Sequence, residues 1–445
     1  MQTPKSINFL EWGERIKNWW AALWARYQDV PLISWLAALS VSVTLEILIG
    51  DPFSRIMGLS KPPALFGVSL VLNKPALFPG AIFYMLLIYL IPTALVAYFS
   101  KGIGNKIAGA LMKSPLIITA IIHLGMIYGV LHLWTVTSDY RLLIARLVMI
   151  AIIVTLSLNV VNGYMGEFSC SHPGFMALGA YGASVFTLVF FVTENRFGEA
   201  LMQPALGPFL FPVSLILGGL LSSIGALLVA IPSFRTRGDY LAIISLAFMF
   251  IVKSLFENLE VVGGARGISN QPNYANLPTV FVWTMLSIWI INNFVSSTMG
   301  KGLNAVRDGE LAASAMTVNT QKTKMIAFLF AAFWAGVGGG LFAHVIGYIN
   351  PGTFDIRKLA EVLAMVYFGG LNSVTGSVVG AVGFSLINES LRPLGIYKWI
   401  IIPVMLILIM IYRPTGLIAF REFNIEALFQ PKDTQKEGGI DHAAA

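Results

Sequence analysis

The sequence predicts an all-α, polytopic membrane protein with about 10–12 transmembrane or re-entrant helices. Of its 445 residues, 56% are hydrophobic and only 11% are charged, and the mean hydropathy is +0.76. In soluble domains about a quarter of the residues are charged, which is far more than in this chain. The chain also has many runs of the ~20 apolar residues that a helix needs to cross a bilayer. The net charge of +7 does not indicate a nucleic-acid partner, because the basic residues lie in short segments between apolar runs.

About a dozen apolar runs define the predicted helices. In chain order they lie at 31–50, 79–99, 115–134, 143–162, 173–194, 209–231, 240–257, 279–297, 324–347, 358–370, 374–391 and 397–413. The run at 358–370 is short, and the stretch GGLNSVTG separates it from the next run. We expect either a half-helix or re-entrant segment here, or a full crossing.

The two terminal regions differ from the rest of the chain. Residues 1–140 are predicted to hold an N-terminal interfacial helix, EWGERIKNWWAALWARY, and extra transmembrane segments. An amphipathic helix packed on the protein's own first spans is the alternative, and the mixed charges argue against a cleavable signal peptide. Residues 421–445 are predicted to be a cytoplasmic polar tail.

The basic residues predict the orientation in the membrane. If each run crosses once and the N-terminus is cytoplasmic, more than half of the 29 Lys and Arg residues face the cytoplasm. Both termini and the polar stretch 299–324 are then cytoplasmic.

Small residues at a spacing of four recur within the later runs. Ala332, Gly336 and Gly340 form one such series, and Gly376 and Gly380 form another. Such residues let helix backbones approach closely in lipid, so we expect tight packing, with a substrate-lining role as the alternative.

Motifs for enzymatic chemistry are missing. The sequence has no GxxxxGK[ST] phosphate loop, no HExxH or comparable metal-ligand spacing, and no nucleophile paired with a base at motif spacing. The single cysteine, Cys170, excludes an intrachain disulfide and a cysteine-based metal cluster. We expect no catalytic residue, no metal site and no cofactor in this chain.

The polar stretch 299–324 lies between two strongly apolar runs. Its GELAASAM segment consists of helix formers with small side chains, with carboxylates near the helix start. This predicts a short helix outside the bilayer that docks into a groove of another protein. Asn319 or Thr320 can cap the next span. An ordinary solvated loop is the alternative.

Polar residues and glycines that interrupt the apolar runs are candidates for a translocation pathway. Irregular backbone at membrane depth requires surrounding protein or a watery cavity, and an ionisable group there suggests function. A buried histidine bonded between helices, or a glutamate near a helix start, is the structural alternative. The candidates are Asn162, Gly163, Gly166, Ser169, Ser171, His172 and Glu361.

Several motifs in order resemble those of one family over roughly residues 140–420. They are NVVNGYMGEFSCSHPGFMALGAY, RTRGDYLAIISLAF, VGGARGIS, the coupling-loop segment GKGLNAVRDGELAASAM, LAMVYFGGLNSVTGSVVGA and YRPTGLIA. Together they resemble the branched-chain amino-acid permeases of ABC transporters, of the LivM type. The chain departs from the family pattern where Gly309 replaces an acid, Ser314 a glutamate and Thr317 the glycine after the short helix. Without that glycine the helix lacks the easiest left-handed cap.

The resemblance implies an ABC permease transmembrane domain at 141–420 in a bacterial plasma (inner) membrane. Its partners would be a second homologous permease, two cytoplasmic ATPase subunits that bind ATP and Mg²⁺, a periplasmic solute-binding protein and membrane lipid. A loop facing the binding protein would contain Gly263, Gly264 and Gly267, unless this is a glycine turn without a contact role. Coupling to the ATPase would involve Arg307, Asp308, Glu310, Ala312, Ala313 and Met316.

The expected function is passage of branched-chain or related hydrophobic amino acids, coupled to ATPase closure. Arg307 has the alternative of pairing only with Asp308, Glu310 or lipid phosphate. Affinity for the amino acid is expected mainly in the soluble receptor, so the sequence leads us to expect no charged pocket. The alternative functions are an ion-coupled secondary transporter or channel, and an ABC permease for urea or short amides.

Overall fold

The structure is a computed structural model that describes residues 25–59, 62–63, 74–193, 197–234, 240–413 and 416–418. Regular structure in this part of the chain is almost entirely helical, and ten of its helices are long and apolar enough to cross a membrane. The predicted all-α, multi-pass fold is thereby confirmed. The predicted interfacial helix lies almost entirely outside the described residues, and the tail 421–445 lies wholly outside them.

The chain forms two compact units, and the first ends at Ser138. In this unit α2 packs against α5 and α6. The predicted run 79–99 is too short, because one continuous helix extends from Phe78 to Met112. Segment 100–112 contains three glycines but no proline, and the next proline is Pro115, so the helix continues to Met112. The helices are α2 (Leu32–Ile56), α4 (Phe78–Met85), the π-helical η3 (Leu86–Leu90), α5 (Ile91–Met112) and α6 (Leu116–Val136).

The second unit begins at Asp139 and contains the remaining elements. In chain order they are α7 (Asp139–Asn159), the π-helical η4 (Val160–Met165), α8 (His172–Phe191), η5 (Pro204–Leu206), α9 (Gly207–Ser233), α10 (Tyr240–Asn258), η6 (Glu260–Val262), η7 (Gly264–Arg266), β1 (Ile268–Ser269), α11 (Leu277–Ser296), α12 (Thr298–Asp308), α13 (Glu310–Ala315), α14 (Thr320–Ile346), β2 (Tyr348–Ile349), η8 (Pro351–Phe354), α15 (Ile356–Gly369), α16 (Val374–Ser390), η9 (Arg392–Tyr397) and α17 (Lys398–Tyr412).

Helix α14 lies in the core of the second unit and packs against α7, α8 and α9. Its glycines face other helix backbones: a Cβ added to Gly179 on α8 would lie 2.1 Å from the carbonyl oxygen of Gly336. A Cβ on Gly380 of α16 would meet the carbonyl oxygen of Met365 at 2.3 Å. The small residues therefore serve tight helix packing, as predicted.

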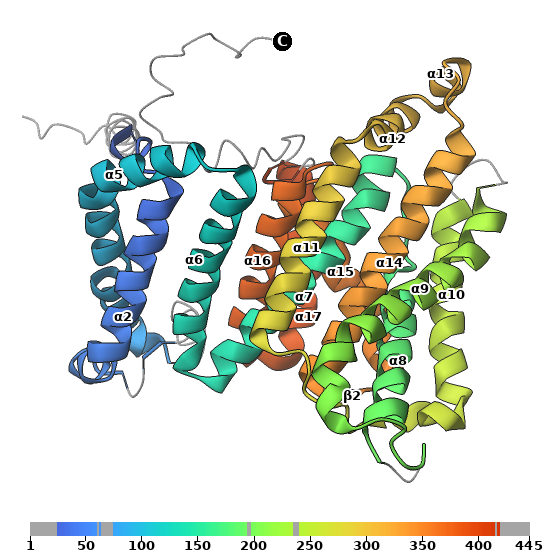
Figure 1. Ribbon diagram of the computed structural model, residues 1–445, viewed down its shortest axis with the longest axis horizontal. Coiled ribbons are helices and arrows are strands. Elements are labelled where there is room, and N and C mark those ends of the chain that lie inside the picture. The colour runs from blue at the N-terminus through green and yellow to red at the C-terminus, as the bar shows by residue number, and fades with distance from the viewer. Residues whose placement is uncertain are drawn as a thin grey trace, which may run out of the picture. The chain divides into compact units, whose positions relative to one another are not determined.

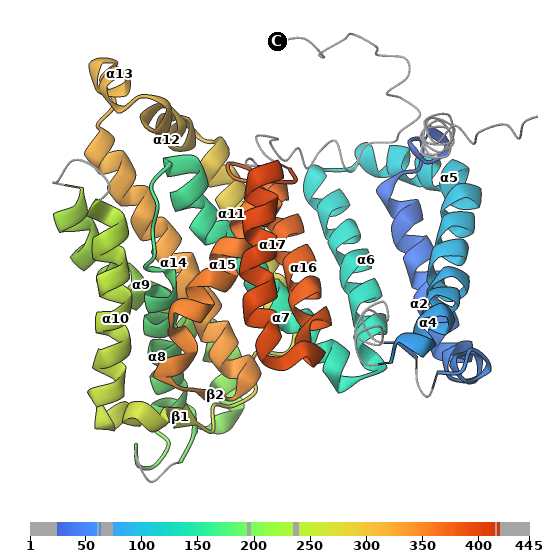
Figure 2. The same ribbon diagram turned by 180° about the vertical axis from the view of Figure 1, so that it is seen from behind.

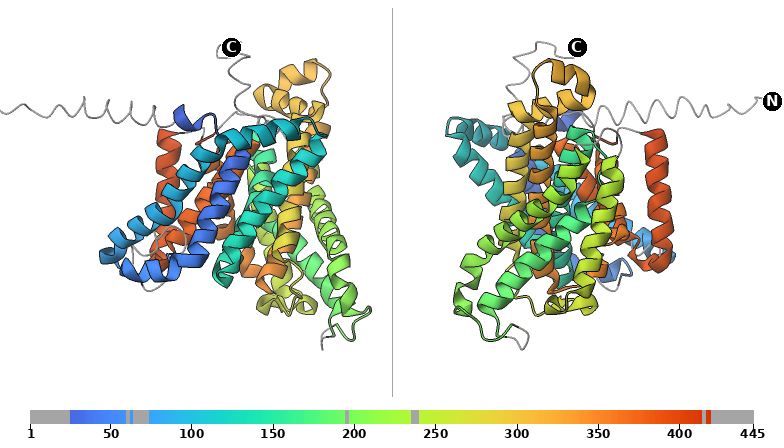
Figure 3. Two further views of the ribbon diagram at one scale, coloured as in Figure 1. Left: turned by 60° about the vertical axis from the view of Figure 1, so that its left-hand side comes forward. Right: turned by 90° about the vertical axis from the view of Figure 1, so that its right-hand side faces the viewer.

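The short elements lie at opposite ends of this unit. Figures 1 and 2 show α12 and α13 at one end and the two-stranded ribbon of β1 and β2 at the other. In both views of Figure 3 the two short helices, in gold, project beyond the ends of the long ones. In the ribbon Ile268 pairs with Ile349 and Ser269 with Tyr348, antiparallel.

Two of the predicted runs are shorter than the ten candidate spans. Helix α15 has 14 residues and α16 has 17. At 1.5 Å per residue α15 is about 21 Å long, which is less than the ~30 Å hydrocarbon core. The half-helix alternative for 358–370 therefore fits the structure, and the α15–α16 junction lies within the helical layer.

Candidate functional site

The polar stretch 299–324 folds into two helices rather than one. Ser297 caps α12 by accepting a hydrogen bond from the backbone of Gly300, and Asn319 caps α14 by accepting one from Lys322. Between them α13 is a single short helix over Glu310–Ala315. The predicted short helix is α13, and the predicted cap of the next span is Asn319. Helix α12 was not predicted from the sequence.

Thr317 ends α13 in the left-handed conformation, with a φ of 67°. The backbone N–H of Val318 donates to the carbonyl of Ala313, and that of Thr317 donates to the carbonyl of Ser314. These two bonds form a Schellman cap, in which this position is usually glycine. The chain keeps the left-handed cap that a glycine would favour, but a β-branched residue adopts it at a cost of about 1–2 kcal/mol.

The α13 side chains divide into a buried and an exposed set. Ala313 is only 4% exposed because it packs inside this chain, so it is not available to a partner. Ala312 is exposed, and Leu311 and Met316 are 81% and 77% exposed. The helix thus presents two large apolar side chains to its surroundings, and Leu311 had not been singled out from the sequence.

Arg307 reaches inward from the end of α12. Its guanidinium pairs with Asp308 at 2.8 Å, and its Nη1 donates to the carbonyl oxygen of Gly163 at 3.2 Å. Its side chain crosses Gly166 so closely that a Cβ there would lie 2.4 Å from the Arg307 Cγ. Arg307 therefore contacts the segment in which α7 breaks, in addition to the expected pairing with Asp308.

Lys324, near the start of α14, joins the same two regions. Its Nζ lies 2.9 Å from Oε2 of Glu310 on α13 and 2.7 Å from Oε1 of Glu167, which follows the broken end of α7. The Lys324 side chain is only 11% exposed. We name these three residues the lysine bridge; its Lys324–Glu167 contact was not predicted from the sequence.

The break after α7 contains most of the predicted pathway residues. The helix widens into the π-helical η4 and ends at Gly166, whose φ of 76° favours glycine. Asn162 accepts a hydrogen bond from the backbone of Ser169, and the hydroxyls of Ser169 and Ser171 are 2.9 Å apart. The backbone N–H of Cys170 donates to Ser245 on α10, so the irregular segment is anchored by side chains.

Gly163 lies within this break and His172 at its end, where α8 begins, and both are in the protein interior. A Cβ on Gly163 would come within 2.6 Å of the backbone nitrogen of Asn372, at the α15–α16 junction. Asn159 holds the same junction, since its side-chain oxygen accepts from the Asn372 N–H at 3.1 Å. His172 is fully buried against Phe175, and within the described residues neither ring nitrogen has a hydrogen-bond partner at standard geometry.

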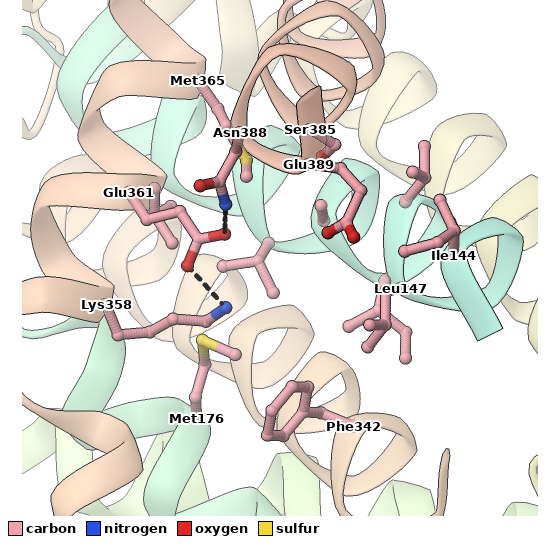
Figure 4. Close-up of a pocket in the computed structure, with 15 residues that line it drawn as sticks. Ile144, Leu147, Met176, Phe342, Lys358, Glu361, Met365, Ser385, Asn388 and Glu389 are labelled. Carbon is pink, nitrogen blue, oxygen red and sulfur yellow. Dashed lines mark hydrogen bonds and ion pairs between the residues drawn. The ribbon is translucent and has the colours of Figure 1, made fainter. Parts of the chain in front are cut away.

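Glu361 lies apart from these residues, in a cavity of about 110 Å³. Figure 4 shows its carboxylate between the ammonium of Lys358 and the amide of Asn388, at 3.0 and 3.3 Å. Glu389 lines the same cavity. A charged pocket is therefore present, contrary to the expectation from the sequence. The feature of the sequence that could have indicated it is the group of polar residues Glu361, Asn388 and Glu389 on two neighbouring helices.

The predicted binding-protein loop is at the other end of the unit, beside the ribbon. Gly263, Gly264 and Gly267 all have positive φ, and a Cβ on Gly267 would lie 2.0 Å from the carbonyl of Ile349. The backbone itself requires these glycines, whether or not the loop meets a partner. The contact role stays a prediction.

Comparisons with known proteins identify the family. The family model described as the permease component of branched-chain amino acid transport systems matches residues 140–411. The chain belongs to this permease family. It is therefore a multi-pass transport permease, and the family is not one of enzymes.

Several relatives of this permease are known by sequence. It is 30% identical to the high-affinity branched-chain amino acid permease protein LivM of Escherichia coli K12, over 72% of this chain and 78% of that one. It is 23% identical to a probable LivM of Methanocaldococcus jannaschii, over 60% and 89%. The LivH protein of E. coli K12 is 28% identical over 37% of this chain and 54% of its own. No solved structure gives a significant match.

Proposed function

We propose that this permease is the LivM-type subunit of an ATP-driven importer of branched-chain amino acids. Its partners are a second permease, two ATPase subunits and a solute-binding protein, and its membrane is the bacterial inner membrane with both termini cytoplasmic. The relatives named for branched-chain amino acid transport support the substrate class. The contacts between α13 and the α7 break support the coupling step.

The observation that carries the proposal is the link between α13 and the broken end of α7. The apolar side chains of Leu311 and Met316 project from α13, where a partner's groove can bury them. Lys324 and Arg307 connect α12 and α13 with Glu167 and Gly163 in the α7 break. Movement of a docked α13 is thus transmitted to the irregular backbone.

In this mechanism ATPase closure displaces α13 and changes the lysine bridge. A ligand or partner shifts a conformational equilibrium only through contacts that differ between the two states. Part of the bridge is solvent-exposed, since the Glu310 side chain is 52% exposed, so its contact with Lys324 contributes no more than about 1 kcal/mol. A contact of that strength can be exchanged during each cycle.

An ion-coupled transporter would also use broken helices, so the alternative needs a direct test. The intramembrane acid Glu46 in the first unit accepts hydrogen bonds from Tyr84 and Tyr89, which favours a structural role for it. The other alternative, a permease for urea or short amides, is tested in the same assay by adding urea or a short amide as a competitor of leucine uptake.

The test is leucine uptake and ATP hydrolysis by the co-isolated complex in proteoliposomes. Leu311→Asp places a charge on the exposed face of α13 and is expected to lower ATP-dependent uptake at least about tenfold, while the protein remains inserted. Leu201→Asp is the matched control, because Leu201 is 68% exposed in the α8–α9 connection. Uptake driven by an ion gradient without ATP, or normal uptake by Leu311→Asp, would contradict the proposal.

A further inference from the structure

The cavity beside Glu361 combines charged and apolar walls within the second unit. Its polar side chains come from the first turns of α15 and the last turns of α16. Most of its apolar side chains come from α7, and the others come from α8, α14 and α15. These helix ends lie toward the β1–β2 ribbon, away from α13. Its lining includes Ile144, Leu147, Phe342, Lys358, Glu361 and Asn388.

The charges of the cavity are balanced. Lys358 pairs with Glu361, and Glu389 pairs with Arg392 at 2.8 Å. A cation or an anion alone would leave a charge without a partner in a low-dielectric space. A zwitterion brings both charges and preserves the balance.

Two polar groups retain capacity for such a ligand. The Lys358 ammonium has three donors, of which one bonds to Glu361, and it lies 5.3 Å over the Phe342 ring. The Oδ1 of Asn388 is buried and has no hydrogen-bond partner among the residues that the structure describes, although a buried acceptor normally has one. Tyr140 and Arg392 both donate hydrogen bonds to Oε1 of Glu389 and not to its Oε2.

The size of the cavity limits the ligand. Its volume of about 110 Å³ is below the ~150 Å³ of a cavity that takes up benzene, so a ligand of at most one small amino acid enters, and the side chains of the wall move apart to admit it. The aliphatic side chains of Ile144 and Leu147 and the ring of Phe342 form an apolar wall beside the charges. A dipeptide or a complete phospholipid exceeds this volume.

We propose that the cavity is a transient binding site of the permease for a zwitterionic amino acid with an apolar side chain. Lys358 binds the carboxylate, Asn388 and Glu389 bind the ammonium, and Ile144, Leu147 and Phe342 receive the side chain. The inference rests on the proposed function, and it assigns to this chain a selectivity that the sequence analysis had left to the soluble receptor.

The cavity shares helices α7 and α8 with the α7 break. Its inner wall contains Val154, Met176 and Met365, and His172 is one helical turn before Met176 on α8. The Sδ of Met365 accepts a hydrogen bond from Thr155 at 3.4 Å, which holds this wall in place. Met176 therefore connects the cavity wall to the helix that begins at His172.

The experiment is equilibrium binding of radiolabelled L-leucine to the co-isolated complex in nanodiscs, without nucleotide or binding protein. Leucinamide, which lacks the carboxylate, and 4-methylpentanoate, which lacks the ammonium, serve as competitors. Both are expected to compete at least about tenfold less well than leucine, because each leaves one charged group of the site without its partner. Equal competition by either analogue would overturn the proposal.

Variants assign the binding to this cavity. Lys358→Gln is expected to weaken leucine binding at least about tenfold and to reduce the preference over leucinamide, whereas Lys358→Arg retains both. Lys253→Gln is the matched control, since Lys253 pairs with Glu257 on α10, outside the cavity. Wild-type affinity in Lys358→Gln would overturn the proposal.

A charge exchange separates ligand binding from a structural ion pair. The double variant Lys358→Glu with Glu361→Lys keeps an i, i+3 pair, so a merely structural role is restored, but leucine binding is expected to stay weak. Recovery of binding in this variant, or a phospholipid retained in the cavity by mass spectrometry in place of leucine, would overturn the proposal.

Parallel uptake measurements distinguish this inference from the proposed function. ATP-driven leucine uptake with an unchanged KM in Lys358→Gln would overturn the cavity site and leave the importer function standing. Saturable, Lys358-dependent leucine binding by a complex that shows no ATP-driven uptake would support the site and contradict the importer function.

Discussion

Glu310 on α13 and Glu167 after the α7 break share one ammonium group, that of Lys324, at 2.9 and 2.7 Å. The first carboxylate belongs to the exposed short helix and the second to the irregular segment that continues into α8. A single side chain thus joins the predicted docking surface to the predicted pathway. The arrangement is a physical route for coupling, and each contact in it can be removed separately.

Removing the ammonium should uncouple hydrolysis from transport. Lys324→Gln leaves two carboxylates without their cation, and we expect ATP-driven uptake to fall at least about tenfold while basal ATP hydrolysis persists. Lys322→Gln is the control, because only its backbone N–H takes part in the helix cap. Proteoliposome uptake and phosphate release measure the two rates, and tightly coupled transport in Lys324→Gln would refute the role of the bridge.

Thr317→Gly should stabilise the short helix. Glycine adopts the left-handed conformation without the β-branched strain, so we expect a gain of about 1 kcal/mol in local stability and slower amide exchange over 310–318. Thr320→Gly is the matched change in the first turn of α14, where glycine should speed exchange instead. Hydrogen exchange with mass spectrometry measures the exchange rates of both variants. Faster exchange in Thr317→Gly than in the wild type would show that the threonine is not strained.

Gly179→Ala should damage the packing of α8 against α14. The new methyl group would lie 2.1 Å from the carbonyl oxygen of Gly336, so the helices must separate, at a cost of about 1–3 kcal/mol or more. We expect a lower melting temperature and a lower yield of monodisperse protein. Gly109→Ala on α5 is the control, since a Cβ there meets nothing within 4 Å; equal yields for the two variants would contradict the packing argument.

Cys170 should report movement of the α7 break. Its side chain is buried, and burial raises the pKa of the thiol, so little reactive thiolate exists at neutral pH and maleimide labelling is expected to be slow. The rate should rise with pH, and ATP turnover should accelerate it if the break opens. As the chain has one cysteine, the wild type can be labelled directly with Cys170→Ser as the blank. A rate that turnover leaves unchanged would indicate a static break.

The amino-acid sequence alone predicts the membrane class, most of the helices and the short helix of GELAASAM. Those features depend on local composition and on the spacing of apolar and small residues, which a single chain displays directly. Thr317 was likewise visible as a departure, because the left-handed cap is a local requirement of the backbone. The resemblance to the permease family rested on ordered motifs of the same kind.

Which charged side chains meet follows from the packing of the helices. Lys324 and Glu167 are 157 positions apart, and Asn388 and Glu361 are 27 apart on different helices. No spacing rule predicts such pairs, because the direction of a side chain depends on how α7, α14, α15 and α16 pack. The lysine bridge and the charged cavity therefore emerge only when helices are brought close enough that buried polar groups must find partners across them.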